Sequence, residues 1–363
     1  MRILSIVGAR PQFVKLAPID KAIRAEGLEH IIVHTGQHYD PQLSDVFFED
    51  LSIPAPDVHL GVGSAGHGEQ TGSILAQMDA VLNEYQPDWV LVYGDTNSTL
   101  AGAISAVKLH FPLAHLEAGL RSFNREMPEE HNRVLTDHAA DLCLAPTDVA
   151  MIHLTAEGLA ERSVLVGDVM TDVLFQVRDA AVAAGTTFSA VADLDEGDYY
   201  VATIHRAENT DDPVRLGEIV SSLQALDRPV VLLAHPRLIA KAAAAHIDLA
   251  GGSVVLHDPL PYPGLVSAVM GSAGVITDSG GLQKEAFLLR VPCTTVRHET
   301  EWVETVELGW NVLANTRDEI LAAARRVLPV ETDERPYGDG NAANAVVQTL
   351  ISLGRIATRK ARV

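Results

Sequence analysis

The sequence is poor in cysteine and in long hydrophobic runs. Its 363 residues include only Cys143 and Cys293, which cannot form a disulfide framework or a four-thiolate zinc site, and this is typical of a reducing cytosol. No segment approaches the roughly 20 apolar residues that cross a bilayer, and the apolar run at residues 1–7 is too short for a signal peptide. We therefore expect a cytoplasmic protein that has no membrane segment.

Basic residues are outnumbered as well. The 27 Lys and Arg residues against 48 Asp and Glu residues leave a formal net charge of -21, which argues against a general binder of nucleic acid. A small anionic metabolite needs only a local group of donors and is compatible with this charge. The 15 histidines come without an HExxH pair, a paired CxxC or a DxDxDG loop, so we expect no metal.

Length and pattern predict an α/β protein. The length suits two domains of roughly 150 to 200 residues. Short β-branched runs alternate with helical patterns such as those at residues 11–25, 71–85 and 341–359, which indicates parallel sheets. The expected strands are residues 2–7, 30–34, 88–93, 113–116, 141–144 and 163–166 and, after an acidic Ala-rich stretch at 180–198, residues 199–204, 230–233, 253–256, 274–277 and 293–296.

We predict two doubly wound, Rossmann-like domains that face a central cleft. The first domain covers residues 1–168 and the second residues 169–340, and the helix in residues 341–363 packs back on the first domain. Ligands of open parallel sheets bind beyond the carboxyl ends of the strands. The unusual polar residues gather at these positions, and they supply the candidate site.

The best candidate for a phosphate site is Thr277-Asp278-Ser279-Gly280-Gly281. It follows an apolar strand and opens a helical pattern, so its N–H groups and the Ser279 hydroxyl face an anion at the positive end of a helix. Glu285 on the same helix could accept both hydroxyls of a ribose. Alternatively, Asp278 and Ser279 only cap the helix. Neither GxxxxGK[ST] nor GxGxxG occurs, which disfavours a P-loop ATPase and a nicotinamide enzyme.

Two cationic pairs also follow predicted strands. Arg10 and Lys15 lie at the junction between the first strand and the first helix, and His205 and Arg206 follow the strand at 199–204. Arg10 and Lys15 could be solvated charges, but the helix dipole opposes a lysine near a helix N-terminus, which favours a functional role. These side chains could donate to a nucleotide or a sugar acid.

Three carboxylates complete the candidate site. Asp95 and Glu117 follow consecutive strands, and Glu129 begins a predicted helix. Proton transfer at neutral pH requires paired carboxylates in different environments, one acting as base and one as acid. The alternatives are an N-cap for Asp95 and an i,i+4 salt bridge from Glu129 to Arg133, worth about 0.3 to 0.5 kcal/mol if exposed. Their convergence on one cleft favours catalysis.

Taken together, these motifs resemble those of the non-hydrolysing UDP-N-acetylglucosamine 2-epimerases. The resemblance covers nearly the whole chain, and seven ordered motifs are more specific than any one of them. They are Gly8-Ala9-Arg10-Pro11 with Lys15, Thr35-Gly36-Gln37-His38, Gly94-Asp95-Thr96, and residues 115–121, 128–133, 205–209 and 277–286.

The resemblance implies a glycosyltransferase-B type fold, a homodimer, and interconversion of UDP-GlcNAc and UDP-ManNAc without a cofactor. In the family mechanism, loss of UDP acidifies the sugar C2–H and gives 2-acetamidoglucal, and re-addition of UDP delivers a proton to the other face. By resemblance, proton handling falls to Asp95, Glu117, Glu129, Arg133 and Lys15, and UDP binding to Arg10, His205, Arg206, Ser279, Gly280, Gly281 and Glu285.

The sequence departs from the family pattern at three places. Gln12 stands where many members carry Glu. Gln37-His38-Tyr39-Asp40 lacks the Arg and Met found in members that a second UDP-GlcNAc activates. Residues 299–304 replace a Thr-Glu-Arg-Pro-Glu pattern and are similar to a subgroup that also contains 2-epimerases of UDP-2,3-diacetamido-2,3-dideoxyglucuronate.

That subgroup supplies the nearest alternative function. A glucuronate substrate should need an additional cation near the sugar carboxylate, for which Arg297 and Arg121 are the candidates. A UDP-sugar-dependent glycosyltransferase of the same fold and a regulator that binds nucleotide sugars without chemistry are more distant alternatives. The three carboxylates disfavour both.

Overall fold

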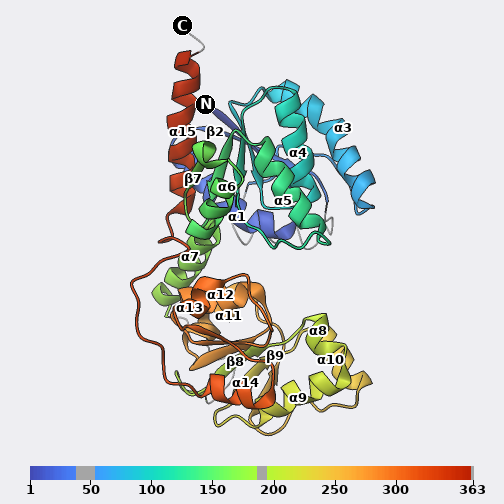
Figure 1. Ribbon diagram of the computed structural model, residues 1–363, viewed down its shortest axis with the longest axis vertical. Coiled ribbons are helices and arrows are strands. Elements are labelled where there is room, and N and C mark those ends of the chain that lie inside the picture. Colours follow the sequence, from blue (N-terminus) through green and yellow to red (C-terminus); the bar gives the residue numbers. More distant parts are fainter. Residues whose placement is uncertain (38–53, 186–193, 361–363) are drawn as a thin grey trace. The chain divides into compact units, whose positions relative to one another are not determined.

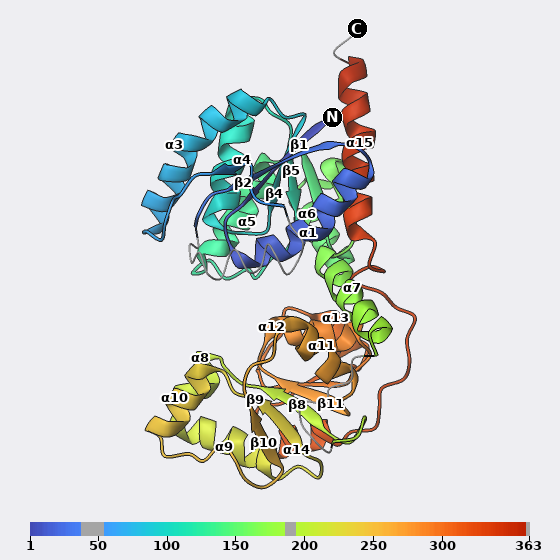
Figure 2. The ribbon, with the colours of Figure 1, turned by 180° about the vertical axis from the view of Figure 1, so that it is seen from behind.

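The chain forms two compact units, each built around its own sheet. The computed structural model describes residues 1–37, 54–185 and 194–360 (Figure 1 and, from behind, Figure 2). The first unit comprises Met1–Val173 and Arg335–Val363, and the second Leu174–Glu334. Helix α7 (Val169–Ala183) begins in the first unit and ends in the second, so the division falls inside a helix.

The first unit contains a seven-stranded parallel sheet. Its strands are β1 (Arg2–Val7), β2 (Glu29–His34), β3 (Val58–His59), β4 (Trp89–Tyr93), β5 (Leu113–Leu116), β6 (Leu142–Ala145) and β7 (Ser163–Leu165), in the order β3-β2-β1-β4-β5-β6-β7. Ile3 of β1 lies opposite His30 on one side and Trp89 on the other. The order reverses between β1 and β4, which is the switch point where such sheets bind ligands.

Side chains alternate between the two faces of this sheet, and each face is covered by helices. The helices are α1 (Arg10–Ala25), α3 (His67–Tyr85), α4 (Asn97–Lys108), α5 (Pro128–Ala139), α6 (Asp148–Ala156), the 3-10 helix η1 (Ala160–Arg162) and α15 (Ala342–Lys360). Ile3 and Val7 pack with α1 and α15, whereas Leu4 and Ile6 pack with α3 and α4. The Trp89 indole donates a hydrogen bond to the Leu350 carbonyl at 3.2 Å, which ties α15 to this unit.

The second unit repeats this plan with six parallel strands. Their order is β10-β9-β8-β11-β12-β13, so the switch point lies between β8 and β11. The strands are β8 (Tyr200–Thr203), β9 (Val230–Leu233), β10 (Val254–His257), β11 (Gly274–Thr277), β12 (Cys293–Thr295) and β13 (Asn311–Leu313), and the helices are α8 (Ala207–Thr210), α9 (Pro213–Gln224), α10 (Pro236–Ala244), α11 (Tyr262–Met270), α12 (Gly280–Leu288), α13 (Val303–Glu307) and α14 (Arg317–Ala324).

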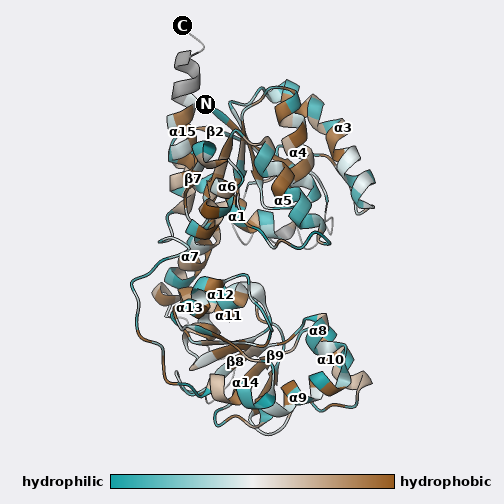
Figure 3. Cartoon of the chain, in the orientation of Figure 1, coloured by the Kyte–Doolittle hydropathy of each residue, from teal (hydrophilic) through white to brown (hydrophobic). Residues whose placement is uncertain are grey.

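The α/β fold class predicted from the sequence is confirmed. Hydrophobic residues are concentrated on the strands of both sheets and on the helix faces that cover them (Figure 3). Sequence analysis missed β3 and β13, which are two and three residues long and lie at sheet edges. None of the helices in the described ranges combines the length and hydrophobicity that crossing a membrane requires.

Candidate active site

Strand ends of the first unit bring predicted site residues together at the switch point. Lys15 lies on α1, directly after β1, while Asp95 follows β4 and Glu117 follows β5. These three strands are neighbours in the sheet. Their parallel direction places all three carboxyl ends at one edge, so one cation and two carboxylates meet there.

Lys15 and Glu117 form a largely buried ion pair. Their side chains are 11% and 16% exposed, so the alternative of a solvated charge at Lys15 is wrong. Gly94 makes room for this pair, because a Cβ at Gly94 would lie 3.1 Å from Glu117 Oε2 and 3.9 Å from Lys15 Nζ. The ammonium group therefore keeps a carboxylate fixed beside the end of β4.

Glu117 has a strained backbone. Its φ of 71° lies in the left-handed region, which costs a residue other than glycine about 1–2 kcal/mol. Gly119, two residues further on, and Gly94, in the loop after β4, adopt φ values of 84° and 61°, which glycine tolerates because it has no Cβ. Strain of this kind persists where the surrounding structure enforces it, commonly at functional sites.

The Asp95 side chain is held by residues of helix α5 and does not cap helix α4. Its Oδ2 accepts from Arg133 Nε at 2.9 Å and NH2 at 2.6 Å, and its carbonyl accepts from Asn132 Nδ2 at 2.8 Å. The N-cap of α4 is Thr96, so the capping alternative for Asp95 is wrong. Burial opposes the charge on Arg133, but Asp95 and then Glu130 raise its pKa.

The two glutamates at the start of α5 have different environments. The side chain of Glu129 is half-buried and makes no hydrogen bond or ion pair with the residues described, so the alternative of a salt bridge to Arg133 is wrong. Arg133 pairs instead with Glu130, at 2.9 Å. Glu130 also accepts from Ser122 N, Ser122 Oγ and Phe123 N, each at 2.9 Å. Burial would raise the pKa of Glu130, but these hydrogen bonds lower it.

Gln12 joins α1 to the end of β4. Its Oε1 accepts from Gly8 N at 2.7 Å and Ala9 N at 3.0 Å, and its Nε2 donates to the Tyr93 carbonyl at 2.7 Å. An amide is needed for this double role, because a glutamate could not donate to Tyr93. Sequence analysis noted Gln12 only as a departure from the family. The side chain of Arg10 and residues 38–40 lie outside the described part of the chain.

In the second unit, the N-terminus of α12 is suited to bind an anion. Ser279 is its N-cap, and the Ser279 hydroxyl accepts from Leu282 N. Within the described ranges, the N–H groups of Gly280 and Gly281 have no hydrogen-bond acceptor. Arg206 lies beside them, since its NH2 would be 3.8 Å from a Cβ at Gly280. Free N–H groups, the helix dipole and a guanidinium all favour a phosphate here.

Asp278 organises the neighbouring loop instead of capping α12. This fully buried carboxylate accepts from His205 N at 3.1 Å, Arg206 N at 2.9 Å and Asn209 Nδ2 at 3.1 Å. His205 Nδ1 lies 3.2 Å from the same carboxylate. Asp278 thereby fixes the end of β8 beside the end of β11. The sequence pattern indicated only a capping role for Asp278.

Glu285 lies in the second turn of α12 and is half-buried. Its Oε1 accepts from the Tyr262 hydroxyl at 3.0 Å. Burial and the neighbouring Glu285 carboxylate raise the pKa of Tyr262 well above its usual range, so the phenol stays a donor.

The two cations considered for binding a sugar carboxylate, Arg121 and Arg297, differ in whether they are available to a ligand. Arg121 is 1% exposed and already pairs with Asp137 at 2.7 Å and Glu157 at 2.7 Å, so it is not available. Arg297 pairs with Glu301 at 2.8 Å. A Cβ at Gly280 would lie 2.3 Å from Glu301 Oε1, so this pair borders the N-terminus of α12. Arg297 is thus the remaining candidate.

Fold and site together define a class of protein. Two parallel sheets with site residues at both switch points are found in glycosyltransferase-B type proteins, and a solved glycosyltransferase, VinC with bound dTDP, shares the fold at 15% identity with a TM-score of 0.55, covering 98% of this chain and 100% of that one. More specifically, the sequence profile described as UDP-N-acetylglucosamine 2-epimerase matches residues 21–351. The chain belongs to this family of isomerases.

Individual relatives match along nearly their whole length. The chain is 46% identical to a UDP-2,3-diacetamido-2,3-dideoxy-D-glucuronate 2-epimerase of Pseudomonas aeruginosa, over 97% of this chain and 100% of that protein. It is 37% identical to a UDP-N-acetylglucosamine 2-epimerase of Methanocaldococcus jannaschii, over 96% and 99%. The solved structure of the UDP-GlcNAc 2-epimerase from that organism covers 97% of this chain and 100% of its own, with a TM-score of 0.86 at 36% identity.

Proposed function

We propose that the protein is a non-hydrolysing UDP-N-acetylglucosamine 2-epimerase that interconverts UDP-GlcNAc and UDP-ManNAc. Membership of the epimerase family over residues 21–351 carries this proposal. A relative solved with UDP-GlcNAc and UDP bound, 37% identical to this chain, supports a UDP-sugar substrate. The N-terminus of α12, with Arg206 and His205 beside it, would bind the diphosphate, and Glu285 the ribose.

The reaction requires a base, an acid and a stabilised leaving group. Breaking the C1–O bond releases UDP, and its charge is taken up by the donors at α12. The C2 proton passes to a carboxylate of the first unit, which leaves 2-acetamidoglucal. Re-addition of UDP to C1, with protonation of C2 from the other face, completes the epimerisation.

The ion pairs suggest how these roles are divided. Glu117 pairs with Lys15 and Asp95 pairs with Arg133, so both carboxylates are candidates for the group that accepts the proton. Glu129 has no cationic partner among the described residues and is half-buried, so it is the candidate for the group that serves the other face of the sugar. We infer that proton transfer on the two faces of the sugar is shared by these three residues.

Proton NMR with UDP-GlcNAc in deuterium oxide tests the proposal directly. The expected result is UDP-ManNAc with deuterium at C2, formed without added metal or nicotinamide. Unchanged and unlabelled UDP-GlcNAc would contradict it. An Asp95→Asn variant supplies the control, because it keeps the neighbouring backbone contacts but removes one proposed proton acceptor.

A second candidate substrate is UDP-2,3-diacetamido-2,3-dideoxyglucuronate. The 46% identity to the Pseudomonas aeruginosa enzyme favours it. Arg297 is the cation that could meet the additional carboxylate, once Glu301 is displaced. Parallel assays with both sugar nucleotides distinguish the candidates, since the physiological substrate should have the higher kcat/KM. If the glucuronate sugar nucleotide is the substrate, Arg297→Gln should reduce its turnover far more than the turnover of UDP-GlcNAc.

We also infer that the enzyme is a homodimer that acts in the cytoplasm. The family resemblance implies the dimer, and the two reduced, buried cysteines, Cys143 and Cys293, suit a reducing compartment. Light scattering during size-exclusion chromatography checks the first inference, and a monomer of 38.9 kDa would contradict it. Cell fractionation checks the second.

A further inference from the structure

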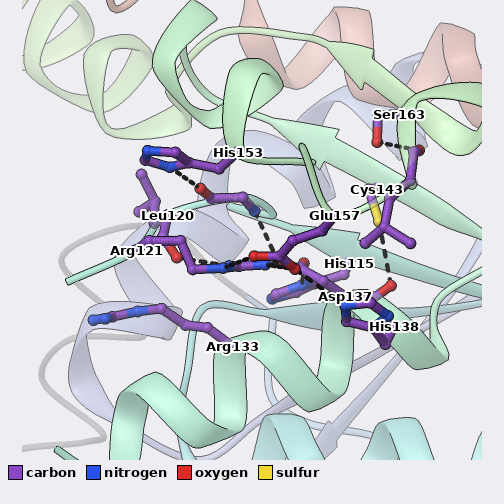
Figure 4. A network of polar contacts seen from close by, with 12 residues as sticks. His115, Leu120, Arg121, Arg133, Asp137, His138, Cys143, His153, Glu157 and Ser163 are labelled. Carbon is purple, nitrogen blue, oxygen red and sulfur yellow. Dashed lines mark hydrogen bonds and ion pairs between the residues drawn. The ribbon is translucent and has the colours of Figure 1, made fainter. Parts of the chain in front are cut away.

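A largely buried ion network in the first unit joins His115, Asp137, Arg121 and Glu157 (Figure 4). At its centre, His115 of β5 is completely buried. Its Nδ1 lies 2.6 Å from Asp137 Oδ1, and its Nε2 lies 2.7 Å from the Gly94 carbonyl. Neither oxygen supplies a proton when Asp137 is ionised, so both ring nitrogens must carry one.

Asp137 is held in its ionised form. This fully buried carboxylate accepts from Gly119 N at 3.0 Å and pairs with Arg121 NH2 at 2.7 Å. Burial would raise the pKa of Asp137, but His115 and Arg121 lower it. Arg121 in turn forms a bidentate ion pair with Glu157, from Nε to Oε1 at 2.7 Å and from NH2 to Oε2 at 2.9 Å. The network thus joins one imidazole and one guanidinium to two carboxylates.

The network ends on the two loops that carry the proposed catalytic groups. The Gly94 carbonyl directly precedes Asp95, and the Gly119 N–H comes two residues after Glu117. Both loops turn through the left-handed region, and Glu117 is the residue in them for which this conformation is strained, because Gly94 and Gly119 have no Cβ. Helix α5 supplies Asp137 to the network and Asn132 and Arg133 to Asp95. One helix therefore fixes both carboxylates.

We propose that His115, as a buried imidazolium, and Asp137 are positioning residues that set the geometry of Asp95 and Glu117. This inference rests on the proposed function. The chain also contains a matched control: His30 pairs with Asp20 at 2.7 Å and with Ser5 Oγ at 2.8 Å and is likewise buried. It lies at the start of β2, at the opposite edge of the sheet from the strand ends.

NMR of the ligand-free protein tests the imidazolium. With nitrogen-15 in the histidine rings, both ring nitrogens of His115 should give N–H signals in the imidazolium range at neutral pH. The His115→Gln spectrum assigns them. His30 needs no second proton, because the Ser5 hydroxyl can donate to it. A neutral His115 with a single ring proton would overturn the proposal.

Steady-state kinetics with UDP-GlcNAc test the positioning. His115→Gln and Asp137→Asn should each lower kcat about 100-fold, the scale of a displacement of about 1 Å, with little change in KM. His30→Gln should keep kcat near the wild-type value, even if its melting temperature falls. If His115→Gln does not fold, the kcat of Asp137→Asn tests the positioning role instead.

An unchanged kcat in Asp137→Asn, or an equal loss of kcat in His30→Gln, would overturn the proposal. Failure of the proposed function is distinct, since the wild-type enzyme would then show no turnover while the NMR result still stands.

Discussion

Two adjacent glutamates at the start of α5, Glu129 and Glu130, have different environments and therefore different roles. Glu130 accepts four hydrogen bonds and is 5% exposed, whereas Glu129 is half-buried without a partner among the described residues. A carboxylate that satisfies several buried donors serves stability. A half-exposed carboxylate without such partners is accessible to a ligand.

Glutamine substitutions separate the two roles. Glu130→Gln should lower the free energy of unfolding by about 1–3 kcal/mol, because an amide accepts fewer of the four hydrogen bonds. Glu129→Gln should leave stability within about 0.5 kcal/mol and lower kcat by about 100-fold or more. Urea unfolding and NMR turnover assays measure both. Equal effects of the two variants on kcat and stability would contradict the distinction.

Glu117 and Lys15 are tested together because they form one ion pair. Glu117→Gln should reduce kcat by about 10²- to 10⁴-fold, since the amide cannot take a proton. Lys15→Met should also destabilise the protein, because it leaves the Glu117 carboxylate without its cation in a nearly buried position. The double variant should regain part of this stability. Stability losses that simply add in the double variant would mean that the pair is not coupled.

At the scale of whole elements, the apolar pattern of the sequence predicted the positions of the central strands. Strands such as β1, β5 and β11 are buried on both faces, so their apolar runs predicted both their position and the strand ends that carry the site. The two short edge strands lack such runs. Predicted strand ends therefore led to Asp95, Glu117 and Ser279 without any knowledge of the packing.

Contacts made by α5 could not be predicted in the same way. The i,i+4 spacing of Glu129 and Arg133 suggested a local salt bridge, but the structure turns Arg133 towards Asp95 and Glu130. Which face of a helix meets a sheet depends on packing between distant segments, and an exposed local pair contributes too little energy to resist it. For the same reason, the contacts of Asp137 could not be predicted from the sequence.

Helix α15 gives a prediction at this scale. Asp172 of α7 accepts from the backbone N–H groups of Ala342 at 3.0 Å and Ala343 at 2.8 Å, and so caps the N-terminus of α15. Asp172→Ala should lower the free energy of unfolding by about 1–2 kcal/mol. Asp212→Ala, which removes a more exposed cap from α9 with one hydrogen bond at 2.8 Å, is the matched control and should cost less. Chemical denaturation measures both, and an equal or smaller loss for Asp172→Ala would contradict the capping role.

At the scale of the whole molecule, the same plan occurs twice. Each unit has a doubly wound parallel sheet, two hydrophobic layers and polar residues at the switch point of that sheet. The first unit presents carboxylates with cationic partners, and the second presents a helix N-terminus with a guanidinium and an imidazole. In the proposed function, proton transfer and diphosphate binding thus belong to separate units, each with its own sheet.

The stability of the first unit should depend on pH through His34. Its ring is 2% exposed and stacks on those of His59 at 4.6 Å and Phe13 at 4.9 Å. Burial, and then the nearby His59, lower the pKa of His34 to about 4, against an ordinary value of about 6.5 in the unfolded chain. Between these values the unfolded chain binds more protons than the folded protein.

Stability from neutral His34 is therefore complete above about pH 6.5 and lost as the pH falls towards about 4. The difference corresponds to on the order of 3 kcal/mol. His34→Gln cannot titrate and keeps an acceptor for the Gly36 N–H, which lies 3.0 Å from His34 Nδ1. Urea unfolding at a series of pH values should show a shallower decline for the variant, so that the gap between the two proteins narrows at low pH. Parallel declines would assign the acid sensitivity to other groups, because a histidine absent from the variant cannot contribute to its slope.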